Sequence, residues 1–243
     1  MKKIYLILLT LVLAGNGILL KAKSEDAENI LEKTTKTVLE NKPEKKAEVV
    51  ESGQILFKVK KAGLWLKDKS NDKKKLHEFT EIVLPGKLYN PPRDILSVEK
   101  KDVDRSTIEG IVASFFSGNR SGELDWIADN FTDSDEEKIK TLFKNKKMLE
   151  ESKSDAEKIF SVYLIGQADY KDSVLVFIEQ DYLGGRKVKE SLACKQTENG
   201  WKVTNEFIND KNFDIIFSAL SSGEFSIKGK ESLKKEKSKD SKS

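Results

Sequence analysis

The chain has 243 residues, enough for one large domain or two small ones, and 35% of its residues are charged. Its formal net charge of +3 is misleading, because residues 1–24 hold four lysines and no acid, and the tail from Lys228 holds seven lysines and three acids. The part between them, residues 25–227, has 33 Lys and Arg against 38 Asp and Glu. This balance argues against nucleic-acid binding, which needs a basic face on the folded domain.

The first 24 residues have the pattern of a bacterial export signal. Lys2 and Lys3 precede an apolar run from Ile4 to Leu13, and Ala22-Lys23-Ser24 fits the small-x-small rule for cleavage after Ser24. We therefore expect an exported protein of the periplasm or the cell surface.

The segment LVLAGNG, residues 11–17, bears on how the protein is held in the envelope. It resembles the lipobox of bacterial lipoproteins, with Asn16 where the acylated cysteine would stand. Thioether acylation needs that cysteine. Three alternatives follow: a cleaved and released protein, a weak N-terminal membrane anchor, or a variant in which Asn16 replaces a native cysteine.

Two segments predict little packed structure. Residues 25–52 are charged and have the composition of a linker or stalk, and residues 228–243 have that of a disordered Lys-rich tail. The leader or the tail could also make weak contact with an anionic membrane.

Residues 53–92 contain short runs rich in Val, Ile, Phe and Trp, which predict a small all-β unit. Within it, Gly63-Leu64-Trp65-Leu66-Lys67 and Ile82-Val83-Leu84-Pro85-Gly86-Lys87 resemble the first half of bacterial SH3-like domains, although Lys67 stands where that family has arginine. The resemblance implies binding of cell-wall peptides, with Trp65 as a contact. The alternative is a small β unit that packs on the next domain.

A helical region is predicted to follow. An apolar stripe at helical spacing predicts the first helix, which Asp104 or Ser106 would cap and Gly118 would end, so that SGNRSG, residues 117–122, is predicted as a loop. The stripe consists of Ile108, Ile111, Val112, Phe115 and Phe116.

Two more helices are predicted over residues 122–131 and 133–147. The second of these begins with an acidic cluster, which consists of Asp133, Asp135, Glu136 and Glu137. It lacks the glycine and the distal glutamate of a calcium loop, so we expect these acids to cap the helix.

Four strands and a closing helix are predicted after Asp155. The strands cover residues 158–167, 172–182, 187–197 and 201–208, and the helix covers residues 212–220. Gly184-Gly185 and Asn199-Gly200 are two-residue hairpin signals. Helices followed by an antiparallel meander define an α+β class.

Residues 103–220 resemble the NTF2-like or SnoaL-like cone domains. STIEGIVASFFSGNRSGELDWIADNF precedes the predicted sheet, and ENGWKVTNEF resembles a late strand of that family. The resemblance implies a curved antiparallel sheet whose concave face lines a pocket. Because the family contains both enzymes and binding modules, the resemblance implies no particular activity.

Two-residue turns at both hairpins also predict which side chains share a face. Glu179 then lies opposite Glu190, with Asp181 as a diagonal neighbour, on a mostly apolar face. That face consists of Leu175, Phe177, Val188, Leu192, Cys194, Trp201, Val203 and Phe207. One carboxyl of such a group would have a raised pKa and could act as an acid or base. The alternative is that these carboxylates lie in water and pair with Arg186 or nearby lysines.

Other chemistry is absent from the sequence. The single cysteine, Cys194, excludes an internal disulfide, and because the only histidine, His77, lies in a distant segment, we expect Cys194 to be a buried apolar thiol. The sequence contains no Cys/His ligand set, phosphate loop or Gly-x-Ser-x-Gly motif, so it predicts no metal site and no cofactor.

These features predict a non-enzymatic envelope protein that binds a protein, peptide or cell-wall element. The contact surface would be the concave sheet face or the Trp65 unit, and the expected ligand-binding residues are Trp65, Trp201, Asn205 and Glu190. The alternative is a small-ligand carrier or pocket enzyme that uses Glu179, Glu190 and Asp181.

Overall fold

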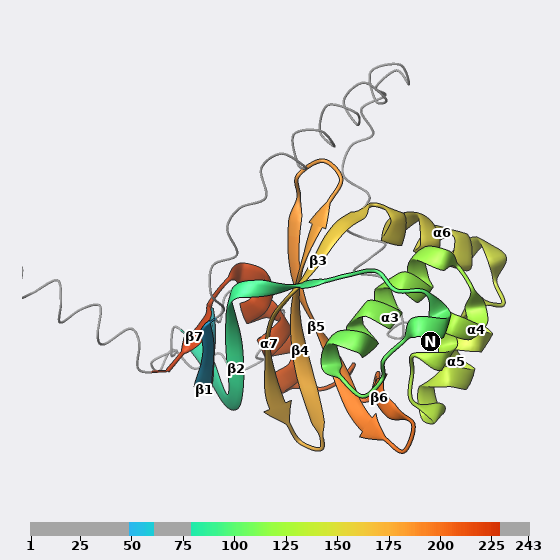
Figure 1. Ribbon diagram of the computed structural model, residues 1–243. Helices are drawn as coiled ribbons and strands as arrows, with labels where there is room; N and C mark the ends of the chain where they lie inside the picture. The colour runs from blue at the N-terminus through green and yellow to red at the C-terminus, as the bar shows by residue number, and fades with distance from the viewer. Residues whose placement is uncertain (1–48, 61–78, 229–243) are drawn as a thin grey trace, which may run out of the picture.

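The computed structural model describes residues 49–60 and 79–228, so the leader with Asn16, most of the linker, Trp65, His77 and nearly all of the tail lie outside it. In the described part, seven strands form one open antiparallel sheet in the order β6-β5-β4-β3-β2-β1-β7 (Figure 1). Helices cover both of its faces, and the predicted α+β class is confirmed.

The bounds of the elements follow the chain. The strands are β1 (Val49–Lys60), β2 (Phe79–Ile95), β3 (Ile159–Tyr170), β4 (Ser173–Tyr182), β5 (Lys187–Thr197), β6 (Gly200–Val203) and β7 (Phe225–Ile227). The helices are the short 3-10 helix η2 (Lys100–Asp102), α3 (Ile108–Ser121), α4 (Leu124–Asp129), α5 (Asp133–Phe143), α6 (Lys146–Glu157) and α7 (Lys211–Ser222). None of these helices is long and apolar enough to cross a membrane.

Strands β1 and β2 belong to the same sheet as the rest of the fold, which corrects the prediction of a separate β unit over residues 53–92. β1 pairs with β2 from Val49, opposite Asn90, to Lys60, opposite Phe79. β2 then pairs with β3, so the sheet continues without a break. Local pattern did not reveal this pairing because four α-helices and the short 3-10 helix η2 separate β2 from β3 in the chain.

The two faces of the sheet are covered by different helices. Helices α3–α6 pack on one face, and α7 packs on the other (Figure 1). The core under α3–α6 includes Phe115 and Ile178, whereas the core under α7 includes Phe177 and Ile216. We call these faces the α3–α6 face and the α7 face.

Helix α3 starts from a different cap than predicted. The hydroxyl of Thr107 accepts a hydrogen bond from the N–H of Gly110 at 3.0 Å, which makes Thr107 the N-cap. Asp104 instead accepts hydrogen bonds from the hydroxyl and backbone N–H of Ser106. These bonds lower the pKa of the Asp104 carboxyl.

Helix α3 also ends later than predicted. It runs past Gly118 to Ser121, and Gly122 ends it in the left-handed conformation, with φ 74°. Residues 117–121 of the predicted loop therefore form the last turn of α3. This turn places Arg120 on a helix that packs against the sheet.

The region predicted as one helix over residues 133–147 contains two. α5 ends at Phe143, and Asn145 caps α6 by accepting a hydrogen bond from the N–H of Lys147 at 3.1 Å. Most of α6 is polar, so its apolar pattern is weak, and its buried residues are Ser152, Asp155 and Ala156.

Asp135 ties α5 to the chain that follows β6. Its carboxylate is 3% exposed and accepts hydrogen bonds from the backbone N–H of Asn205 at 2.8 Å and from the hydroxyl of Thr204 at 3.3 Å. Burial raises its pKa, but the hydrogen bond from Asn205 and the ion pair with Lys138 outweigh burial and leave the pKa below its usual value. The acidic cluster thus contributes a structural contact.

Replacing Asp135 with alanine should lower the free energy of unfolding at pH 7 by about 2–4 kcal/mol, because the Asn205 N–H and the Thr204 hydroxyl lose their buried acceptor. Urea denaturation measures this change. The matched control is Asp133→Ala, since Asp133 is exposed in the same helical turn. Because the pKa of Asp135 is depressed, its contribution is present above the unfolded pKa of about 4 and is lost as the pH falls through the folded pKa. Equal losses in the two variants would contradict this account.

Candidate functional site

The register of the β4–β5 hairpin differs from the prediction by one residue. Tyr182 and Arg186 close the turn, where the N–H of Tyr182 donates to the Arg186 carbonyl at 2.8 Å. The loop therefore has three residues, and its two glycines, Gly184 and Gly185, both have positive φ, at 96° and 83°. Glu190 consequently faces Ile178 across the ladder.

This one-residue difference separates the three predicted carboxylates. Glu179 pairs with Lys189, and Asp181 pairs with Lys187, on the α7 face of the sheet. Glu190 lies on the α3–α6 face, with Leu192 and Cys194 as predicted within β5. The structure therefore does not bring Glu190 together with the other two acids.

Glu179 and Asp181 are partly exposed and paired with lysines. The ammonium of Lys187 lies 3.0 Å from Glu179 and 3.1 Å from Asp181, and Lys189 lies 3.6 Å from Glu179. These contacts raise the pKa of Lys187. The two acids thus match the alternative in which the carboxylates pair with nearby lysines.

Glu190 is a buried acid with a different environment. It is 5% exposed and accepts a hydrogen bond from the side-chain amide of Gln180, which in turn accepts one from the Tyr182 hydroxyl at 2.9 Å. Burial raises the pKa of Glu190 to about 7, although the Gln180 bond opposes the shift. Burial, and then the charge of Glu190, raise the pKa of Tyr182 to about 12.

Glu190→Gln should remove a pH-dependent loss of stability. The folded pKa of about 7 exceeds the usual value of 4.5, so folded Glu190 keeps its proton while the unfolded chain releases it as the pH rises from 4.5 to 7. Stability therefore falls over this window, by an amount on the order of 3 kcal/mol for a pKa that rises from 4.5 to about 7. Glutamine can still accept from Gln180, so relative to the wild type the variant should gain this amount between pH 4.5 and pH 8.

Urea denaturation of both proteins at pH 5 and pH 8 measures the effect. Subtracting the variant from the wild type cancels the contributions of all other titrating groups. A difference that stays constant between the two pH values would mean that Glu190 is ionised in the folded state at pH 5.

The other predicted binding residues lie elsewhere. Trp201 pairs with Gln196 near the far end of β5 and packs partly against the α3–α6 core, and Asn205 follows β6 and donates its backbone N–H to Asp135. The β5–β6 register differs from the prediction by two residues, so Trp201 stays on the same face of the sheet as Cys194, as predicted. Trp65 lies outside the described residues.

Cys194 is the buried apolar thiol that the sequence predicts. It is fully buried in the α3–α6 core, and burial raises the pKa of its thiol to about 12. A thiol with this pKa is not a nucleophile at neutral pH.

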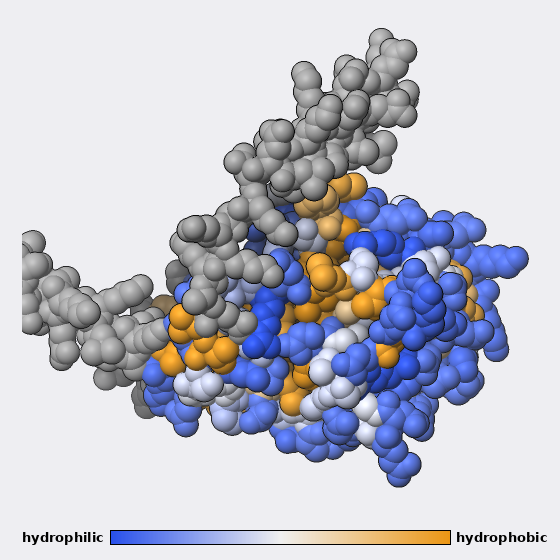
Figure 2. Space-filling model, in the orientation of Figure 1, coloured by the Kyte–Doolittle hydropathy of each residue, from blue (hydrophilic) through white to orange (hydrophobic). Residues whose placement is uncertain are grey.

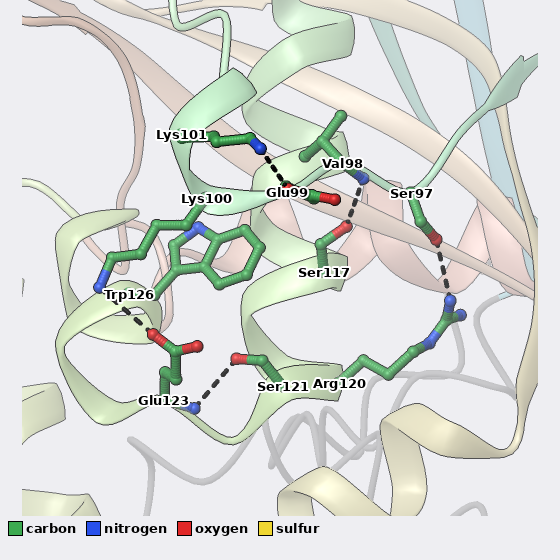
Figure 3. A pocket seen from close by; sticks show the side chains of 10 residues that line it. All are labelled: Ser97, Val98, Glu99, Lys100, Lys101, Ser117, Arg120, Ser121, Glu123 and Trp126. Atoms are coloured by element: carbon green, nitrogen blue, oxygen red, sulfur yellow. Dashed lines mark hydrogen bonds and ion pairs between the residues drawn. The ribbon is translucent and has the colours of Figure 1, made fainter.

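An open groove of about 550 Å³ lies between the chain that follows β2 and the α3–α4 corner (Figure 3). One wall is the segment Ser97–Lys101, and the other is formed by the last turn of α3 and by α4. The lining consists of Ser97, Val98, Glu99, Lys100, Lys101, Ser117, Arg120, Ser121, Glu123 and Trp126. We call it the β2–α3 groove.

Hydrogen bonds hold the walls of the groove in place. The N–H of Val98 donates to the Ser117 hydroxyl at 3.0 Å, and the indole N–H of Trp126 donates to the buried hydroxyl of Ser114 at 2.9 Å. Trp126 is 5% exposed, so it lines the groove from a fixed position rather than as a free side chain. The groove is therefore preformed.

The rim of the groove carries five charges. Lys100 lies 3.4 Å from Glu123, and Lys101 lies 2.9 Å from Glu99, all with exposed side chains (Figure 3). Exposed pairs of this kind are weak and exchange readily for other partners. The fifth charge, on Arg120, makes the rim net positive.

A small recess of about 30 Å³ adjoins the groove and shares Ser97, Ser117 and Arg120 with it. Two exposed apolar side chains also line the recess, Leu96 at 76% and Phe160 at 66% exposure. Figure 2 shows apolar surface on this side of the molecule, over the chain that leads from β2 to α3. The groove and recess together form an amphipathic surface.

The sequence did not predict this surface. The predicted loop over residues 117–122 contains Arg120, and Phe160 lies in an apolar run that predicts a core strand. A bulge between Ile159 and Ser161 allows both Ile159 and Val162 to face the core, which leaves Phe160 outside. Gly122, as a C-terminal signal for α3, could have placed Arg120 on the helix.

The described residues contain no group of three or more His, Cys, Asp or Glu side chains that could hold a metal ion. Comparisons with family models, curated proteins and solved structures find no match to the chain.

Proposed function

We propose that this chain is an exported, non-enzymatic cell-envelope protein that binds a protein, peptide or cell-wall element. The β2–α3 groove is the contact surface. The observation that carries the proposal is the continuity of this open, preformed groove with the exposed side chains of Leu96 and Phe160. Apolar side chains that gather beside a groove with polar rims are typical of interaction sites.

The placement of the acids also supports binding rather than catalysis. Glu190 lies apart from Glu179 and Asp181, and it bonds to Gln180 in the interior. Its neighbours on the α3–α6 face, Ile178 and Leu192, are fully buried against the helices. An acid enclosed in this way has no open position at which a substrate atom could approach it.

The NTF2-like likeness is part of this proposal. Helices α3–α6 on one face of β3–β6 support it, whereas β1, β2 and β7 lie outside residues 103–220, which the resemblance covers. Under this proposal the helices fill the space that lines a pocket in other members of such a fold, and the binding surface has moved to the β2–α3 groove.

A photo-crosslinking amino acid at position 101 should capture the envelope partner in native cells. Lys101 lies on the groove rim, and its side chain is 76% exposed, so substitution there should not disturb the fold. The matched control is position 211, because Lys211 is exposed at the start of α7 on the opposite face of the sheet. The expected result is a discrete crosslinked species at position 101 and none at position 211. The same product from both positions would exclude the groove as the contact surface.

The mass of the protein purified from separated membrane and soluble fractions tests export. Cleavage after Ser24 predicts a mature chain that begins at Glu25. A membrane species that retains Met1 would show that the leader serves as an anchor, and a mass with acyl chains would show that residue 16 is natively cysteine. A cytoplasmic species that retains Met1 would contradict export.

A further inference from the structure

Among the residues that the structure describes, Arg120 differs from the neighbouring arginines in having no carboxylate partner. Arg93 pairs with Glu109, and Arg105 pairs with Asp129. Within residues 79–228, by contrast, no carboxylate lies within ion-pair distance of Arg120, whose guanidinium donates to the Ser97 hydroxyl and the Ile159 carbonyl, both at 2.9 Å.

These two bonds fix the guanidinium without neutralising it. They join the last turn of α3 to the end of β2 and the start of β3, so the group is held at the junction of three elements. Arginine has five N–H donors, and neutral oxygens take only two of them here. A fixed, partly buried cation with spare donors is suited to a planar carboxylate, which it can bind with charge-assisted hydrogen bonds.

The apolar neighbours of Arg120 define what should accompany the carboxylate. Leu96 and Phe160 line the same recess as Arg120 and expose most of their surface. A ligand that placed an apolar group on these two side chains would cover surface that otherwise contacts water. An apolar group next to a carboxylate therefore matches the recess in both charge and polarity.

We propose that the recess at Arg120, Leu96 and Phe160 binds a peptide segment that carries an apolar side chain next to a carboxylate. The carboxylate bonds to the Arg120 guanidinium, and the apolar side chain lies on Leu96 and Phe160. The rest of the segment extends along the β2–α3 groove, past the lysines of its rim. This inference rests on the proposed binding function and names the partner's chemistry at that site.

The test uses N-acetyl-phenylalanine and its amide as probes, because the two differ only in the terminal charge. Titration into the ¹⁵N-labelled full chain reports binding through backbone N–H shifts. We expect the acid to shift the signals of Leu96, Ser97 and Phe160 and to bind at least about fivefold more tightly than the amide, as one charge-assisted bond would give. Equal binding of acid and amide, or shifts confined to other residues, would overturn the proposal.

Variants test separately the charged part of the recess, at Arg120, and its apolar part, at Leu96 and Phe160. Arg120→Gln should remove the preference for the acid. Arg120→Lys keeps the charge and should retain part of that preference, so it serves as the test if the glutamine variant folds poorly. Phe160→Ser should weaken both probes. The matched control is Leu183→Ser, since Leu183 is 63% exposed but does not line the recess. A loss of binding in Leu183→Ser as large as that in Phe160→Ser would overturn the assignment of the apolar part.

The outcomes distinguish this inference from the proposed function. If the crosslinking residue at position 101 captures a partner, and captures it equally well in a chain that also carries Arg120→Gln, the groove binds the partner and the carboxylate assignment fails. If the acid probe binds in the recess but position 101 captures nothing, the recess is an anion site and the proposed partner binding fails.

Discussion

The burial of strand β4 on both faces is the constraint on which the rest of this structure depends. Leu175, Val176, Phe177 and Ile178 follow one another in the chain, and all four are fully buried. Because successive side chains of a strand point to opposite faces, this run requires an apolar cover on each side of the sheet. Helices α3–α6 supply one cover and α7 supplies the other, and each buried side chain of this size contributes about 1.5–3 kcal/mol.

The same constraint explains which parts of the fold the sequence predicts. The helical stripe of α3, the closing helix α7 and the strands β3 to β5 were predicted close to their observed bounds, since each has a strong local pattern. The register of β4 was predicted incorrectly, because a strand buried on both faces shows no alternation of apolar and polar residues that would fix its register. The prediction then depended on turn length alone, and a three-residue loop in place of two moved Glu179 and Asp181 to the face opposite Glu190.

The local sequence pattern does not predict features that depend on contacts between residues distant in the chain. One partner of β2 is β3, which follows only after η2 and the four helices α3–α6, and α6 is a polar helix held by packing rather than by an apolar stripe. Glu190 was correctly placed on an apolar face from its position in β5, yet its hydrogen bond to Gln180 depends on the observed pairing with β4. The candidate site is the part that the sequence predicts least well, since the β2–α3 groove lies between segments that only the folded chain brings together.

The α3–α6 core and the recess meet at the start of β3, and this junction determines which side chains line the recess. The bulge beside Phe160 lets Ile159 and Val162 both enter the α3–α6 core, and the carbonyl of Ile159 accepts from Arg120. The bulge thus lets β3 bury two side chains in the core and leaves the Phe160 ring exposed, while the backbone at the same place orients the Arg120 guanidinium beside that ring. An exposed phenylalanine alone is ordinary, and so is an arginine bonded to a carbonyl. Their juxtaposition beside a preformed groove favours recognition over solvation, because two hydrogen bonds already hold the Arg120 guanidinium and it does not have to be reorganised when a ligand arrives.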